Sequence, residues 1–246
     1  MELFLWFGIF IAFILILQGL LFAFFGSIAK YLGKQTRPYS VKRDGKKVLI
    51  LGDSVIAGTG VSRPEFSLIG RLGTEFDTLS IENKAIVGSG TRELALYLRD
   101  HHHSPVDFVI IQIGGIDTLT LRSLKYFARR IEYIVTEAKK ISHDNVIICS
   151  SGNIGNLPFL FFPFNSFFEN RTRKIREIFL RITREQNTSY VDFFEERETD
   201  PFRKHPCRFF SPDGIHPNDE GCHLWYVRLR EIFLRISTEK ETSEKI

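Results

Sequence analysis

The sequence predicts an α/β protein in which helices cover both faces of a parallel sheet, preceded by one membrane-spanning helix. Short apolar runs without alternation, such as 48–51 and 108–111, are typical of strands buried on both faces. Amphipathic segments follow these runs, and the alternation of strands with helices favours a parallel sheet. An uncharged stretch at residues 3–29 predicts the membrane-spanning helix.

The elements of the sheet domain are expected in a regular order over residues 47–236. Most of the expected strands end in Gly, Ser, Asn or Asp, a composition typical of turns. Helices are expected where apolar residues recur at helical spacing, as for Leu124, Phe127, Ile131 and Ile134. Strands are expected at 47–51, 78–83, 107–113, 145–150 and 189–193, and helices at 64–76, 91–99, 121–141, 167–186 and 219–236. The remaining polar tail, 237–246, is expected to fray.

The N-terminal stretch is expected to be a retained anchor over residues 1–29. Its apolar run exceeds the roughly 20 residues that cross a bilayer, and Gln18 is its one strongly polar side chain. A signal peptide would begin with basic residues and carry a shorter apolar run, whereas Glu2 precedes this one. A cleaved signal peptide, with Ser27-Ile28-Ala29 resembling a cleavage site, and a buried core helix are the alternatives.

Basic residues follow the anchor and predict its orientation. Residues 30–46 include Lys30, Lys34, Arg37, Lys42 and Arg43, and such an excess favours a single-pass protein whose domain faces the cytoplasm. The extracytoplasmic face stays open as the alternative. We expect 30–46 to be a juxtamembrane linker, either solvated or attracted to anionic head groups. The net charge of +4 does not suggest a nucleic-acid partner.

Two stretches far apart in the sequence carry the candidate chemistry. Ser54 follows the first strand, at the edge where open α/β sheets bind ligands, and Asp213 and His216 lie on a turn about 160 residues later. A serine nucleophile needs a base, and the base needs an orienting acceptor. We therefore expect Ser54 as nucleophile, His216 as base and Asp213 as orienting acid, with backbone N–H groups of Ser54 and of glycines at other strand ends stabilising the oxyanion. Asp53 is expected to enter the helix, and no metal or other cofactor is expected.

These stretches resemble the conserved blocks of the GDSL/SGNH hydrolases. Leu51-Gly52-Asp53-Ser54 is similar to the first block, Asn83 with Gly88 to the second, and Asp213-Gly214-Ile215-His216-Pro217 to the fifth. The resemblance covers residues 46–236. It implies a three-layer, flavodoxin-like fold, a serine esterase or lipase activity, Ser54, Asp213 and His216 as catalytic residues, and the Gly88 N–H in the oxyanion hole.

The third block departs from the family pattern. Gln112-Ile113-Gly114-Gly115-Ile116-Asp117 places Ile116 where the family has an asparagine that donates to the oxyanion, and losing one such donor typically costs about 10²–10³ in rate. Three interpretations remain open. Backbone donors from Ser54, Gly88 and Gly115 suffice, or Asn153 at the next strand end substitutes, or the activity is weak.

A phenylalanine-rich loop follows the fourth strand. Phe159, Phe161 and Phe162 are expected either to form an aromatic wall for an acyl chain or to dip into the membrane, with packing on the core as the alternative. The sequence thus predicts a membrane-anchored serine hydrolase that cleaves lipid-like or membrane-proximal esters through an acyl-enzyme on Ser54. Acyl transfer, glycan deacetylation at the same site, and a catalytically weak membrane-associated binding protein are the alternative functions.

Overall fold

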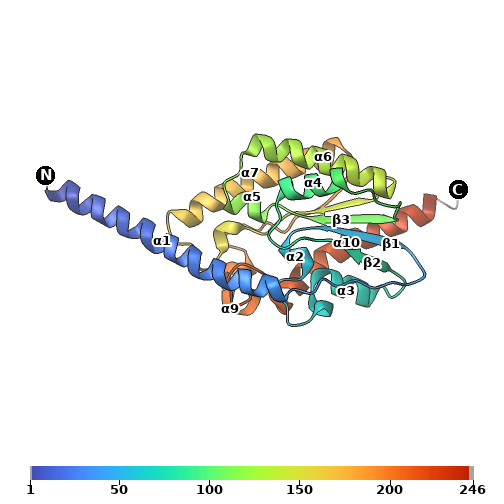
Figure 1. Cartoon of the computed structure of the whole chain (residues 1–246), viewed down its shortest axis with the longest axis horizontal. Helices are drawn as coiled ribbons and strands as arrows, with labels where there is room; N and C mark the ends of the chain where they lie inside the picture. Colours follow the sequence, from blue (N-terminus) through green and yellow to red (C-terminus); the bar gives the residue numbers. More distant parts are fainter. Residues whose placement is uncertain (1, 244–246) are drawn as a thin grey trace.

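The computed structural model describes residues 2–243 and contains a five-stranded parallel sheet in the order β2-β1-β3-β4-β5 (Figure 1). All four neighbouring pairs are parallel, and this order is that of flavodoxin-like folds. The predicted fold class is therefore confirmed. The strands are β1 (Lys47–Gly52), β2 (Ser80–Asn83), β3 (Phe108–Gln112), β4 (Val146–Cys149) and β5 (Ser189–Val191).

Helices cover both faces of the sheet. One face packs on α3 (Leu68–Glu75) and α10 (Asp219–Ser243). The other packs on α4 (Thr91–Asp100), α6 (Leu124–Ser142) and α7 (Phe164–Glu185). Successive β1 residues point to opposite faces, so Val48 and Ile50 enter one core and Leu49 and Leu51 the other. Burial on both faces explains why this strand is apolar throughout.

Several short helices were missed by the sequence analysis because they are too short to show helical periodicity. Three of them follow strand ends: α2 (Ser54–Ala57) after β1, α5 (Gly115–Leu119) after β3, and η2 (Ile154–Asn156) after β4. The others are η1 (Pro64–Phe66), which separates from α3 within the single helix expected at 64–76, α8 (Pro201–Lys204) and α9 (Pro206–Phe209).

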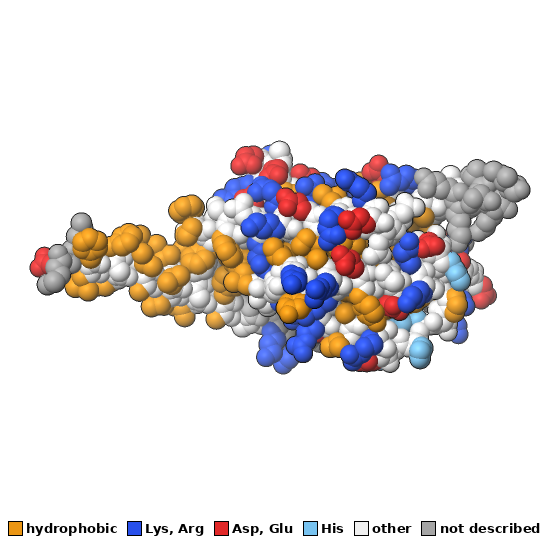
Figure 2. All heavy atoms as spheres, turned by 90° about the horizontal axis from the view of Figure 1, so that it is seen from above, with side chains coloured by type: hydrophobic (Ala, Val, Ile, Leu, Met, Phe, Trp, Pro, Cys, Tyr) orange, Lys and Arg blue, Asp and Glu red, His pale blue; other side chains and the backbone are white. Residues whose placement is uncertain are grey.

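The N-terminal helix α1 (Glu2–Gln35) begins away from the domain and ends against it (Figure 1). Its segment Phe4–Gln35 is long and apolar enough to cross a membrane. Figure 2 shows mainly hydrophobic side chains on its projecting half, whereas charged side chains are spread over the surface of the domain. Gln18, in the middle of the helix, is only 2% exposed and lies against the domain. The expected boundary between anchor and linker at residue 29 therefore does not coincide with the end of the helix.

The expected linker 30–46 is not a free tether. Residues 30–35 belong to α1, and Val41 forms an antiparallel bridge with Ile81. The Arg43 guanidinium donates to the Gly73 carbonyl at 2.8 Å. The polar tail also differs from expectation, since α10 stays helical through Ser243, and residues 244–246 lie outside the described part of the chain. The division into anchor, linker, domain and tail stays a prediction.

Candidate active site

The end of β1 positions the candidate nucleophile. Gly52 has a φ of +139°, and a Cβ there would lie 2.0 Å from the Gln112 carbonyl oxygen of β3, so only glycine fits. Asp53 then caps α2, its Oδ1 accepting the Val55 N–H at 3.0 Å. Ser54 is thereby the first residue of α2, beside the β1–β3 junction where the strand order reverses.

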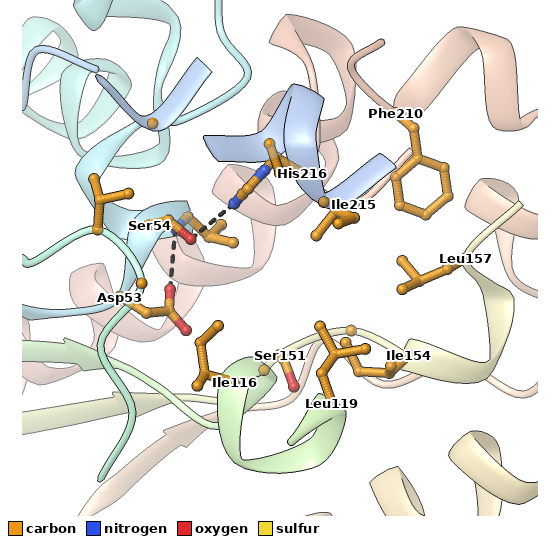
Figure 3. Close-up of a pocket in the computed structure, with 18 of the residues that line it drawn as sticks. Asp53, Ser54, Ile116, Leu119, Ser151, Ile154, Leu157, Phe210, Ile215 and His216 are labelled. Atoms are coloured by element: carbon orange, nitrogen blue, oxygen red, sulfur yellow. Dashed lines mark hydrogen bonds between the residues drawn. The ribbon is translucent and has the colours of Figure 1, made fainter. Parts of the chain in front are cut away.

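The structure brings Ser54, His216 and Asp213 into one hydrogen-bonded chain. The Ser54 Oγ lies 2.7 Å from His216 Nε2 (Figure 3). His216 Nδ1 lies 2.5 Å from Asp213 Oδ2. All three side chains are buried. An imidazole held between a hydroxyl and a carboxylate has one nitrogen available to accept the serine proton, which is the arrangement that activates a serine.

Asp213 is held as a carboxylate by donors on both oxygens. Besides the imidazole, its Oδ1 accepts from the Ser211 hydroxyl at 2.6 Å and from the backbone N–H groups of Ile215 and His216 at 2.9 Å each. Burial alone would raise the pKa of Asp213, but its hydrogen bonds and its attraction to His216 hold that pKa below the usual value. The group can therefore orient and stabilise an imidazolium.

Asp53 is a second buried carboxyl beside the nucleophile. Burial raises its pKa to about 7, although the Val55 N–H and the nearby His216 act in the opposite direction. Its structural role agrees with the expected helix-entry position. The raised pKa was not predictable from the sequence, because burial of this side chain depends on how the surrounding strand ends pack.

A cavity of about 730 Å³ opens beside Ser54 and is mainly apolar. Figure 3 shows Ile116, Leu119, Ile154, Leu157, Phe210 and Ile215 arranged around it, with Ser54 and His216 at one end. Gly88 and Gly115 also line it. Gly88 has a φ of +78°, a conformation that favours glycine, and Gly115 begins α5. The Ile116 side chain is a hydrocarbon and has no hydrogen-bond donor for an oxyanion in the cavity.

Asn153 lines the cavity but holds the loop around it. Its amide nitrogen donates to the Glu195 carbonyl at 3.0 Å and to Glu169 Oε1 at 3.3 Å, and its Oδ1 accepts the Gly155 N–H at 3.0 Å. Both of its N–H groups are thus engaged. For Asn153 to replace the missing oxyanion donor, one of these two hydrogen bonds would have to break.

The expected aromatic wall has a different place in the structure. The Phe159 ring stacks on Phe25 of α1 at 4.7 Å and meets Phe22 edge-on at 5.3 Å. Phe161 contacts Phe164, and Phe162 is 75% exposed. The described residues that line the cavity do not include these three phenylalanines. The loop instead forms a docking surface for α1.

One side of the cavity was not foreseen at all. Its residues come from α1 and lie on one face of that helix: Phe22, Gly26, Ala29, Lys30, Gly33 and Lys34, here called the cavity face. Their spacing of three, four and seven residues is a helical signal that was present in the sequence. It was hidden because residues 3–29, which hold half of this face, carry no charge and read as a membrane span. Among residues 2–243 no cluster of His, Cys, Asp and Glu is arranged to hold a metal ion.

Comparisons with known proteins agree with the fold. The model of the GDSL-like lipase/acylhydrolase family matches residues 50–224. The psychrotrophic esterase EstA from Pseudoalteromonas sp., in a structure inhibited by monoethylphosphonate, superposes with a TM-score of 0.58 at 17% identity, over 78% of this chain and 99% of that one. A lipase/acylhydrolase from Enterococcus faecalis gives 0.56 at 20% identity, over 77% and 96%. No curated protein sequence matches the chain.

Proposed function

The chain belongs to the GDSL-like lipase/acylhydrolase family, and from this premise we propose that it is a membrane-anchored serine hydrolase acting on lipid-like carboxylic esters. The observation that carries the proposal is that hydrogen bonds link Ser54 to His216 and His216 to Asp213 at the end of an apolar cavity. Such a site combines an activated nucleophile with room for a hydrocarbon chain.

Acylation follows from the hydrogen bonds of the three residues. Ser54 Oγ attacks the ester carbonyl carbon while His216 Nε2 accepts the hydroxyl proton, and the carbonyl electron pair moves onto its oxygen. Asp213 stabilises the imidazolium that forms. The bond from carbon to the alcohol oxygen then breaks, and His216 returns its proton to the departing alcohol. This leaves the acyl group on Ser54.

Deacylation repeats these steps with water as nucleophile. Water attacks the acyl carbon and gives a proton to His216, and Ser54 Oγ then leaves with that proton. The products are the free carboxylic acid and the starting enzyme. In both steps the backbone N–H groups of Ser54, Gly88 and Gly115 are the donors we assign to the oxyanion, because all three residues line the cavity.

Retention of α1 is part of the proposal. Cleavage after Ala29 would remove Phe22, Gly26 and Ala29 from the cavity wall and the aromatic contacts of Phe22 and Phe25. A retained helix of this length anchors the domain to a membrane. The basic residues after the span favour the cytoplasmic face.

Intact-mass analysis after treatment with a small fluorophosphonate tests the proposal. We expect one phosphonyl adduct on the wild-type protein, none on Ser54→Ala, and labelling slowed by at least about 10³-fold on His216→Ala. Ser27→Ala, which changes a serine on α1 outside the cavity lining, is the matched control and should label like the wild type. Absence of an adduct on folded wild-type protein would refute a working nucleophile and favour the binding-protein alternative.

A further inference from the structure

The cavity face of α1 places a membrane helix directly in the wall of the candidate active site. The face runs from Phe22 to Lys34, which corresponds to about 18 Å along the helix axis. Besides the stacking of Phe25 on Phe159, two polar contacts attach the helix to the domain. Gln18 bonds the Phe159–Phe161 loop, and the Thr36 hydroxyl lies 2.7 Å from that of Thr59. The helix is thus fixed at both ends of the cavity.

Two glycines give the cavity face its shape. A Cβ on Gly33 would lie 2.7 Å from a Val87 methyl group, so Gly33 lets α1 approach the segment that carries Gly88. A Cβ on Gly26 would meet no heavy atom of the described residues within 4 Å. Because Gly26 lines the cavity, there is unfilled space at the position where any other residue would place a side chain.

The length of α1 sets the depth of this cavity in a bilayer. The segment from Phe4 to Leu17, which precedes the docked half, spans only about 21 Å, less than the hydrocarbon core of about 30 Å. The hydrocarbon core of the bilayer must therefore extend along α1 past Gln18 to about Phe22. Phe162, which follows Phe161, is 75% exposed, and Phe167, whose ring meets that of Phe168, is 52% exposed. Because Phe161 bonds Gln18 and Phe168 contacts Phe22, both add apolar surface near the docked part of α1. One end of the cavity consequently lies at the depth of the lipid chains.

We propose that α1 is part of the substrate site: its cavity face binds the acyl chain of a membrane lipid ester that enters from the bilayer, and Gly26 sets the chain length accepted. This inference rests on the proposed function, since the carbonyl carbon must reach Ser54. The apolar side chains of Leu119, Ile154 and Leu157 form the opposite wall. Together with Phe22, Gly26 and Ala29 of α1, these side chains give the cavity a mainly hydrocarbon lining that suits a long acyl chain.

Gln18 explains how a membrane helix holds this position. Its Nε2 donates to the Phe159 carbonyl at 3.2 Å, and its Oε1 accepts the Phe161 N–H at 3.4 Å. At hydrocarbon depth these groups have no water to bond, so pairing them with one another satisfies a helix side chain and a loop backbone together. The contact fixes the register of the cavity face relative to Ser54.

The test measures labelling of Ser54 by fluorophosphonates that carry methyl, octyl or hexadecyl chains, using the full-length protein in phosphatidylcholine vesicles. The proteins are the wild type, Gly26→Leu, Gly26→Ala and, as matched control, Gly8→Leu. Gly8 lies five turns earlier on the same side of α1, outside the cavity lining. We expect the wild type and Gly8→Leu to react faster as the chain lengthens, and Gly26→Leu to lose at least about tenfold in its hexadecyl-to-methyl rate ratio.

The outcomes distinguish a failure of this inference from a failure of the proposed function on which it rests. If Gly26→Leu has the same chain-length profile as the wild type, the proposed role of α1 is overturned. Labelling of Ser54 would in that case still support the proposed hydrolase function. Absence of labelling in every protein would overturn both. Should Gly26→Leu react with no probe, Gly26→Ala decides: an intermediate profile supports the proposal, and a wild-type profile overturns it.

Discussion

The two sides of the cavity are built in different ways. The domain side carries Ser54, His216 and Asp213, which are buried and fixed by at least five hydrogen bonds among them and their neighbours. The α1 side carries no group of the catalytic chain, and it is fixed by ring contacts, by Gln18 and by Thr36. Under the two proposals above, the domain side determines whether a reaction occurs, and the α1 side determines which substrate reaches Ser54.

This contrast separates the effects of substitutions. A change on the domain side should lower the rate for every ester in the same proportion, because it alters the transition state common to all. A change on the α1 side should alter the preference among chain lengths. Substitutions that affect both properties together would show that the two sides are not independent.

Asp213→Asn has the largest expected effect. The amide cannot stabilise the imidazolium and favours the wrong imidazole tautomer, so kcat should fall by about 10³–10⁴-fold. Steady-state hydrolysis of a butyryl and a palmitoyl ester measures kcat. Asp192→Asn is the control, because the Asp192 carboxylate pairs with Arg176 outside the cavity. Equal losses for both esters are expected. A loss confined to palmitoyl would contradict the division between the two sides.

Ile116→Asn should increase activity. An amide at this position adds a donor where α5 faces the cavity, and one such donor is worth up to about 10² in turnover. Ile116→Val, which shortens the same side chain without adding a donor, separates the hydrogen bond from the gain in space. A rise in kcat shared by both variants would assign the effect to space, and no rise in either would mean that the backbone donors already suffice.

Asp53 predicts how stability depends on pH. Its pKa is raised to about 7 by burial, so the folded state binds a proton that the unfolded state has lost, and stability should fall as pH rises from about 4 to 7. Asp53→Asn keeps the helix cap and removes this titration. Between pH 5 and pH 8 the wild type should lose roughly 2 kcal/mol more than the variant. Urea unfolding at both pH values measures the difference; equal losses would show that the burial of Asp53 does not control this dependence.

The sequence predicted the sheet and the proximity of Ser54, His216 and Asp213 because their signals are local or ordered. Val48–Leu51 shows its burial as an apolar run, and Ser54, Asp213 and His216 stand in motifs with fixed spacing. The roles of Asn153, Phe159 and Gly26 were not predictable in this way. Asn153 depends on Glu169 and Glu195 from other elements, and Gly26 and Phe159 depend on how α1 docks. Uniform apolarity predicts a membrane helix but does not distinguish its docked face from its lipid-facing one.

The smallest expected effect, and the most direct test of the α1 side, is that of Gln18→Leu. The variant leaves the Phe159 carbonyl and the Phe161 N–H without their partner, which should cost about 1 kcal/mol of stability in a membrane setting. Gln35→Leu, the same substitution at an exposed position near the end of α1, is the control. Thermal unfolding in phospholipid micelles measures stability, and the hexadecyl-to-methyl labelling ratio measures register. A lower ratio with unchanged methyl labelling would mean that α1 has shifted while the catalytic chain stayed intact, which is the behaviour expected if the two sides are separable. A parallel loss of labelling with both probes would show instead that the anchor also holds Ser54 and His216 in place.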